Sequence, residues 1–156
     1  SLPWTFPSGI TEPEGQVLTE DGSKLWLSGK RDDKAVVCLS APDGKILFET
    51  AGEMAGLGPD SASCVVRDGG FRIVRADGAA EASLTRFYNK LLKEELAMRL
   101  ADPAQADKKF DESSVVFFPI FSPDGKSFAL HAEHGLYIAS LGTGELRRLT
   151  KPAPSH

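Results

Sequence analysis

Short apolar runs separated by Gly, Asp and Pro make up most of this chain. In one such run, Phe128 and Leu130 alternate with small or polar residues such as His131, which is the two-residue period of a half-buried strand. The runs at 36–39 and 136–139 are apolar throughout, which predicts strands covered on both faces. The pattern therefore predicts a mostly β protein built from many short antiparallel strands.

Three segments repeat one pattern, a turn motif centred on an Asp, then short strands and a closing Thr. Each divides into four strands, and a four-stranded unit of about 40 residues is a β-propeller blade. Pro fixes its own φ, Asp bonds back to the backbone and Gly adopts the left-handed conformation, so the motif builds a turn. The repeats run from Asp21 to Thr50, from Asp60 to Thr85 and from Asp124 to Thr150. The residues expected to shape these turns are Asp21, Gly22, Pro59, Asp60, Pro123, Asp124 and Gly125, with further turns at 42–45, 77–78 and 142–144.

An insertion separates the second and third repeats. The motif Asp residues are 39 and then 64 positions apart, so the second gap is longer by 25 residues. Residues 84–101 have the spacing of an amphipathic helix, with Lys90 and Glu94, and Glu95 and Arg99, as i,i+4 pairs on its polar side. Two interpretations stay open: the helix packs on its own propeller, or it binds another chain. Its apolar stripe comprises Leu84, Phe87, Tyr88, Leu91, Leu92, Leu96, Met98 and Leu100.

The pattern divides the chain into an arm, a propeller-like domain and a tail. The arm is rich in Pro and Gly, and both a mobile leader and an added edge strand fit it, with Trp4 and Phe6 as candidate anchors. After the insertion, a strand is expected over 115–121. The boundaries are a leader arm at 1–15, a propeller-like β domain at 16–150 with blades at about 16–50, 53–85 and 115–150, a helical insertion at about 84–112, and a tail at 151–156.

The third repeat resembles a known family. Its segments 122–126, 135–137, 143–145 and 148–150 read SPDGK, GLY, TGE and RLT, and this arrangement is similar to the repeat of TolB-type propellers. Similar blades form the propeller domains of prolyl-oligopeptidase-type peptidases, which keep their nucleophile in a separate hydrolase domain that this chain lacks. The second repeat departs from the family at Ser61, where the family has Gly. The resemblance implies propeller-type blades, and the TolB likeness favours the bacterial periplasm over the cytoplasm.

Three blades are fewer than a closed propeller needs, because closed propellers have about four to eight. Three outcomes are open. Two chains form one six-bladed ring as a dimer, the commonest homo-oligomer. Alternatively, the blades belong to a longer chain or a hetero-complex, or a fourth blade is built from the leader and other segments. An isolated open arc is disfavoured because it would leave apolar faces and strand edges in water.

Charge and hydropathy narrow the partner classes. Lys and Arg number 18 and Asp and Glu 22, so the net charge is −4, without the concentrated basic face of a nucleic-acid binder. The chain has no apolar run of about 18 residues that would span a membrane. We therefore expect a protein partner or a homo-oligomer.

No constellation in the sequence indicates catalysis. Cys38 and Cys64 read as buried free thiols, with a disulfide as the alternative, and two cysteines do not make a zinc site. His131, Glu133 and His134 form a tight cluster of metal-ligand types, but a hairpin tip explains them. In a strand only His131 and Glu133 share a face, and His134 falls in the turn, so a third ligand is missing. Paired carboxylates such as Glu94-Glu95 read as solvated charge. Motifs for serine hydrolases, phosphate loops and dinucleotide sites are absent, so the sequence predicts no enzyme, no cofactor and no metal.

The leading hypothesis is a non-enzymatic β-propeller-type scaffold for protein interactions, completed by self-association or a partner chain. The alternative is a ligand-binding or substrate-gating module associated with a hydrolase. The candidate contact residues are Trp4, Phe6, Phe87, Tyr88, Leu91 and Met98.

Overall fold

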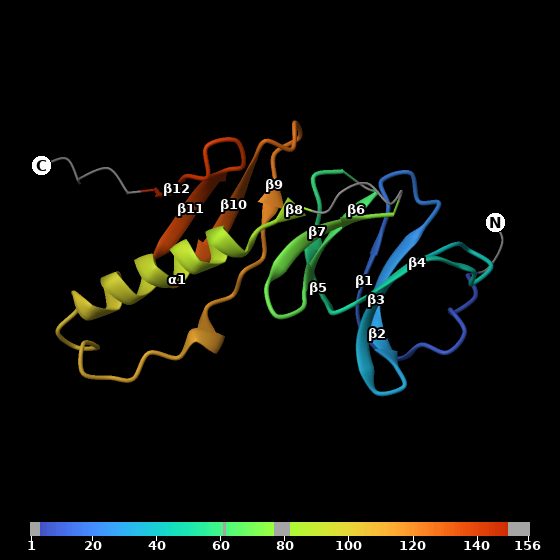
Figure 1. The fold of residues 1–156 in the computed structure, drawn as a ribbon, viewed down its shortest axis with the longest axis horizontal. Helices are drawn as coiled ribbons and strands as arrows, with labels where there is room; N and C mark the ends of the chain where they lie inside the picture. Colours follow the sequence, from blue (N-terminus) through green and yellow to red (C-terminus); the bar gives the residue numbers. More distant parts are fainter. Residues whose placement is uncertain (1–3, 61, 77–81, 150–156) are drawn as a thin grey trace, which may run out of the picture. The chain divides into compact units, whose positions relative to one another are not determined.

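The computed structural model describes residues 4–60, 62–76 and 82–149, which form three four-stranded antiparallel sheets and one long helix (Figure 1). The mostly β, blade-like fold class predicted from the sequence is therefore confirmed. The chain divides into two compact units, residues 1–84 with two sheets and residues 85–156 with the helix and the third sheet. The predicted turn at 77–78, Ser61, Thr150 and the tail lie outside the described residues.

In each sheet the strands follow one another in chain order. The first sheet comprises β1 (Thr11–Leu18), β2 (Leu25–Arg31), β3 (Lys34–Ser40) and β4 (Ile46–Ala51). The second comprises β5 (Glu53–Leu57), β6 (Ser63–Arg67), β7 (Phe71–Arg75) and β8 (Ala82–Ser83). The second unit holds α1 (Thr85–Leu100), the single-turn 3-10 helix η1 (Glu112–Ser114), and the third sheet of β9 (Ile120–Phe121), β10 (Ser127–Ala132), β11 (Gly135–Ser140) and β12 (Leu146–Arg148).

Two element boundaries differ from the sequence-based expectation. Residues 11–15, expected in the leader, belong to β1, whose ladder with β2 contains a bulge between Thr11 and Gly15. The strand expected over 115–121 is shorter, because only Ile120 and Phe121 pair with β10. Blade-like sheets therefore begin earlier in the first repeat and later in the third than the pattern predicts.

The motif turns join the first and second strands of their sheets. The Thr19 hydroxyl and the Ser23 backbone N–H and hydroxyl all donate to Asp21 Oδ1, at 2.8, 2.9 and 2.7 Å. In the third sheet the Ser122 hydroxyl and the Lys126 N–H donate to Asp124 Oδ1 at 2.6 and 3.0 Å. Each turn then needs a left-handed residue, which Gly22 supplies with φ 73° and Gly125 with φ 71°.

The second repeat builds the same turn differently. Gly58 stands where the other repeats have Thr19 and Ser122, so the capping hydroxyl comes instead from Ser63. The Ser63 hydroxyl donates to the Asp60 carbonyl at 2.9 Å, and Asp60 Oδ1 accepts from the Ala62 N–H at 3.0 Å. A Cβ added at Gly58 would lie 2.1 Å from Ser63 Oγ, so the glycine makes room for that hydroxyl.

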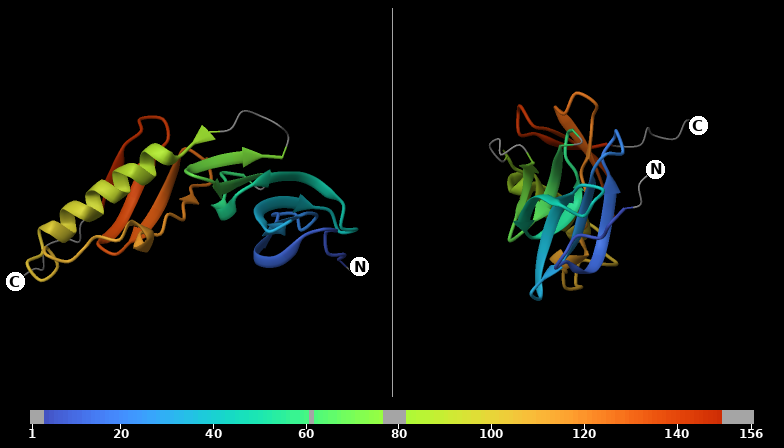
Figure 2. Two further views of the ribbon diagram at one scale, coloured as in Figure 1. Left: turned by 60° about the horizontal axis from the view of Figure 1, so that its bottom comes forward. Right: turned by 90° about the vertical axis from the view of Figure 1, so that its right-hand side faces the viewer.

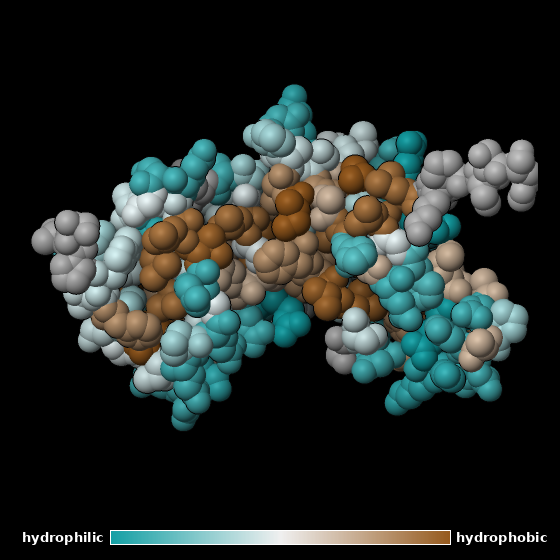
Figure 3. Space-filling model, turned by 180° about the vertical axis from the view of Figure 1, so that it is seen from behind, coloured by the Kyte–Doolittle hydropathy of each residue, from teal (hydrophilic) through white to brown (hydrophobic). Residues whose placement is uncertain are grey.

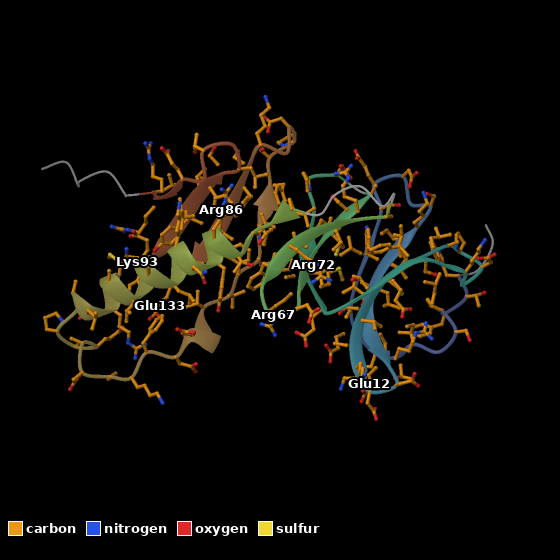
Figure 4. The ribbon with its side chains drawn as sticks, in the orientation of Figure 1. Glu12, Arg67, Arg72, Arg86, Lys93 and Glu133 are labelled. Atoms are coloured by element: carbon orange, nitrogen blue, oxygen red, sulfur yellow. The ribbon has the colours of Figure 1, made fainter. Side chains whose placement is uncertain are left out.

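The first unit has its main core between its two sheets. We call the side of the first sheet that carries Trp26 and Leu39 the tryptophan face, and it packs against Cys64, Val66 and Val74 of the second sheet. At this boundary the Ser28 hydroxyl accepts a hydrogen bond from the Met54 N–H at 3.3 Å. Arg72 (Figure 4) ties β7 to β4 by donating to the Thr50 hydroxyl at 2.9 Å and the Ala51 carbonyl at 3.2 Å.

The opposite side of the first sheet, the cysteine face, carries Leu27, Val36 and Cys38 and packs against Ile10 and Ile46. Cys38 and Cys64 therefore lie in different clusters as buried free thiols, not in a disulfide. Burial raises the pKa of Cys38 to about 11 and that of Cys64 to about 12.

In the second unit α1 lies along one face of the third sheet (Figure 2). Phe128 on β10 is the centre of this core, with the Phe87 ring edge-on at 5.1 Å and the Phe117 ring at 6.2 Å between centroids. The residues of α1 that are buried here are Phe87, Leu91 and Glu95, spaced four apart. The apolar stripe expected from the sequence includes Phe87 and Leu91, which are buried, but also Leu96 and Leu100, which are exposed.

Candidate interaction surface

The side of the third sheet away from α1 carries apolar residues in register. Ala129 of β10 pairs with Ile120 of β9 and with Ile138 of β11, so their side chains share one face, together with Leu136 two residues from Ile138. Ile120 is 61% exposed, Leu136 48% and Ile138 39%. Figure 3, which views the molecule from behind, shows apolar atoms gathered over this sheet. We call this the open face.

The expectation that both faces of 136–139 are covered is therefore wrong for β11. Tyr137 and Ala139 are buried beneath α1, whereas Leu136 and Ile138 are exposed. The matching expectation for 36–39 is confirmed, since all four residues of that run are buried. Two similar apolar runs thus differ only in whether a neighbouring layer covers their second face.

The open face corresponds position by position to the tryptophan face of the first sheet. Trp26 follows its motif Asp by five residues, and Ala129 follows Asp124 by the same interval. Their cross-strand partners also correspond, because Trp26 pairs with Leu39 and Ala129 with Ile138. Trp26 and Leu39 are buried against the second sheet, so the third sheet leaves uncovered the very positions that the first sheet buries.

The candidate contact residues predicted from the sequence lie in three different environments. Phe87 and Leu91 are fully buried between α1 and the third sheet, so they are core residues and not available to a partner. Tyr88 and Met98 are half-buried, and the Tyr88 ring packs edge-on against Phe117 at 5.8 Å. Trp4 and Phe6 are exposed. The open face went unnoticed because a run apolar on both sides predicts burial of both.

A buried carboxylate is the other feature that the sequence analysis missed. Glu95, 2% exposed, accepts hydrogen bonds from the His134 N–H at 3.2 Å and from the Tyr137 hydroxyl at 3.0 Å. His134 Nδ1 also lies 3.0 Å from Glu95 Oε2, which joins α1 to the β10–β11 hairpin. Burial, reinforced by the Glu95 carboxylate, raises the pKa of the Tyr137 hydroxyl well above its ordinary value.

This geometry corrects two expectations about Glu95. It is not a solvated charge like its neighbour Glu94, and its partners are His134 and Tyr137 in place of the expected Arg99. Arg99 instead donates to the Lys109 carbonyl at 2.9 Å. The signal was present in the spacing, because Glu95 continues the four-residue interval that begins at Phe87 and Leu91.

A recess of about 320 Å³ adjoins this cluster, and Glu133 of the β10–β11 hairpin is among the residues that line it. Figure 4 labels Glu133. The recess mixes apolar groups with carboxylates and imidazole. Within the described part of the chain, no three His, Cys, Asp or Glu side chains converge to hold a metal ion. The lining residues are Glu95, Phe110, Ser114, Val115, Val116, His131, Ala132 and Glu133.

The two units differ in charge. Residues 1–84 carry 8 Lys and Arg against 13 Asp and Glu, a net charge of −5, whereas residues 85–156 carry 10 against 9, a net charge of +1. Arg86 and Lys93 lie on α1 (Figure 4), where Lys90 donates to the Gly144 carbonyl and Arg86 to the Leu141 carbonyl at 3.0 Å.

Comparisons with known proteins identify the fold. No protein-family model and no curated protein matches the chain. The chain is similar to a solved structure of a "putative TolB" from Agrobacterium tumefaciens, with 13% identity and a TM-score of 0.58 over 95% of this chain and 50% of that one. This chain thus spans about half the length of the structure it matches, and the likeness supports a partial propeller-type fold. None of the described helices is long and apolar enough to cross a membrane.

Proposed function

We propose that this chain is a partial propeller that acts, without catalysis, as a rigid scaffold for protein association, and that a second copy covers its open face. The observation that carries the proposal is the uncovered apolar face of the third sheet, at positions that the first sheet buries against a neighbouring blade. Ile120, Leu136 and Ile138 form a contiguous apolar patch, and such patches mark interaction sites.

A second copy is the occupant that fits best. The chain matches half of a longer propeller-type structure, so two copies would supply six blades. The charges of the two units also favour a head-to-tail arrangement, in which the second unit of each copy meets the acidic first unit of the other. A twofold axis makes both contacts identical and closes the ring.

Ile138→Asp tests this association. A carboxylate on the open face would have to be buried without a partner, and it would face an acidic unit, so the dimer should dissociate. Leu96→Asp is the matched control, because Leu96 is 37% exposed but lies on α1, on the other side of the third sheet. Leu91 is unsuitable, since it is buried in the core and its substitution would test folding.

Light scattering on a sizing column, over a concentration series, measures the native mass. We expect the unsubstituted chain and Leu96→Asp to approach twice 16.8 kDa at high concentration, and Ile138→Asp to remain at the monomer mass with an unchanged circular dichroism spectrum. Equal association of Ile138→Asp and Leu96→Asp would show that the open face is not the contact.

A further inference from the structure

The contact inside the first unit shows how neighbouring blades of this chain fit together. The tryptophan face of the first sheet packs on the side of the second sheet that carries Cys64 and Val66. Val66 follows Asp60 by six residues, and Leu27 follows Asp21 by the same interval, so the receiving side of the second sheet corresponds to the cysteine face of the first. A tryptophan-type face therefore packs on a cysteine-type face.

The packing of a tryptophan-type face on a cysteine-type face also specifies what would cover the open face. That face is of the tryptophan type, so in a second copy its counterpart is the cysteine face of the first sheet. Leu27, Val36 and Cys38 form this surface, and it belongs to the acidic unit. Both faces are apolar, as sheet-on-sheet packing requires.

The cysteine face is already covered in the monomer by residues 4–10, which we call the strap. Ile10 is buried against Leu27, Val36 and Cys38. A Cβ added at Gly29 would lie 2.8 Å from Ile10 Cγ2, so the strap approaches the sheet closely where no side chain intervenes.

The strap is held by few polar contacts. Its Thr5 N–H donates to the Pro42 carbonyl at 2.8 Å, and Arg31 reaches the Ser8 carbonyl at 3.5 Å. Arg31 makes its shorter bonds to Glu49, at 2.8 and 2.9 Å, and these do not depend on the strap. Trp4 and Phe6 remain exposed on it. Displacement of the strap would therefore break few polar contacts, and what it would lose is chiefly the burial of Pro7 and Ile10.

We propose that the strap is a self-blocking segment that occupies the docking surface for the open face of a second copy. This inference rests on the proposed function, since it assumes that the open face binds a second copy. Two copies close into a ring only when both straps leave their cysteine faces. The strap thus sets the concentration at which the chain assembles. If the strap leaves the face about 10% of the time, the apparent dissociation constant of each contact is about tenfold above its strap-free value.

Deletion of residues 1–10 tests the strap directly, because it removes the whole strap, including Ile10, and leaves β1 in place. Sedimentation equilibrium should show a dissociation constant for the deleted chain at least about tenfold below that of the full chain. Adding Ile138→Asp to the deletion should return the protein to a monomer. Should the deletion impair folding, full-length Ile10→Ser loosens the same contact and should tighten association in the same direction.

The outcomes separate the two proposals. If the deleted and full-length chains associate with equal constants and Ile138→Asp abolishes both, the strap proposal is wrong and the open face stands. If Ile138→Asp changes the association of neither the deleted nor the full-length chain, the proposed contact between copies is wrong, and the strap proposal is wrong as well. If the mass of the deleted chain rises beyond the dimer, the strap is supported, but the closed ring is overturned.

Discussion

Replacing Glu95 with Ala removes the acceptor of three hydrogen bonds from the inside of the second unit. The Tyr137 hydroxyl is fully buried, so its loss of a partner costs about 1–3 kcal/mol. The His134 side chain is 17% exposed and regains part of its hydrogen bonding from water. With the lost packing included, we expect Glu95→Ala to lower the free energy of unfolding by about 3 kcal/mol, within the range for one partner of a buried pair.

Tryptophan fluorescence reports on the first unit, and the circular dichroism of the helix reports on the second. Both tryptophans, Trp4 and Trp26, belong to the first unit, whereas α1 belongs to the second. Urea unfolding followed by circular dichroism at the helix band should show the destabilisation of Glu95→Ala. Glu94→Ala is the matched control, because Glu94 is exposed and its substitution should stay within about 0.5 kcal/mol.

A double-mutant cycle separates the cost of leaving the Tyr137 hydroxyl without an acceptor from the stabilisation provided by the hydrogen bond between Tyr137 and Glu95. Glu95→Leu alone should be strongly destabilising, whereas adding Tyr137→Phe removes the unpaired hydroxyl and should recover about 1 kcal/mol or more. The reasoning would be refuted if Glu95→Ala were as mild as Glu94→Ala, or if Tyr137→Phe gave no recovery.

Two further predictions concern titratable groups of the first unit. Hydrogen bonds from the Ser23 N–H, the Ser23 hydroxyl and the Thr19 hydroxyl lower the pKa of Asp21 from 3.8 to about 2, so its stabilisation is present above pH 3.8 and is lost as pH falls towards 2. Asp21→Ala should therefore be less stable than the unsubstituted chain at pH 7, with the difference vanishing near pH 2, as measured by thermal unfolding across pH. Because burial raises the pKa values of Cys38 and Cys64, neither thiol should react with a thiol-specific disulfide reagent at pH 8 until urea unfolds the chain; rapid labelling of the native protein would contradict their burial.

The blade turns are an example of structure that residues close together in the sequence determine. Thr19, Asp21 and Gly22 satisfy one another within six residues, and Ser122, Asp124 and Gly125 repeat the arrangement. Because the donors, acceptors and left-handed residue are all local, the motif predicts the turn without knowledge of the rest of the chain. The number and order of the strands around each turn follow from the same pattern.

The helix shows where such reasoning ends. Its limits were predicted to within a residue, because Asp102-Pro103 stops it and its residues favour helix. The sequence did not single out the buried residues of the helix, because α1 carries apolar residues over a broad arc and the expected stripe was wider than the side that is buried. The side of the helix that packs against the Phe128 ring carries Phe87, Leu91 and Glu95. Packing on the sheet therefore buries a carboxylate at a position where the helix alone would favour an apolar residue.

The sequence by itself determined the repeat, the turns, the strands and the presence of the helix, because each depends on residues close together in the chain. Tertiary structure decided which faces are covered. The runs at 36–39 and 136–139 are equally apolar, yet a second layer buries Val37 and Leu39 while Leu136 and Ile138 remain exposed. Burial is a property of two surfaces distant in sequence, so no local pattern distinguishes a core strand from one that still lacks its neighbour.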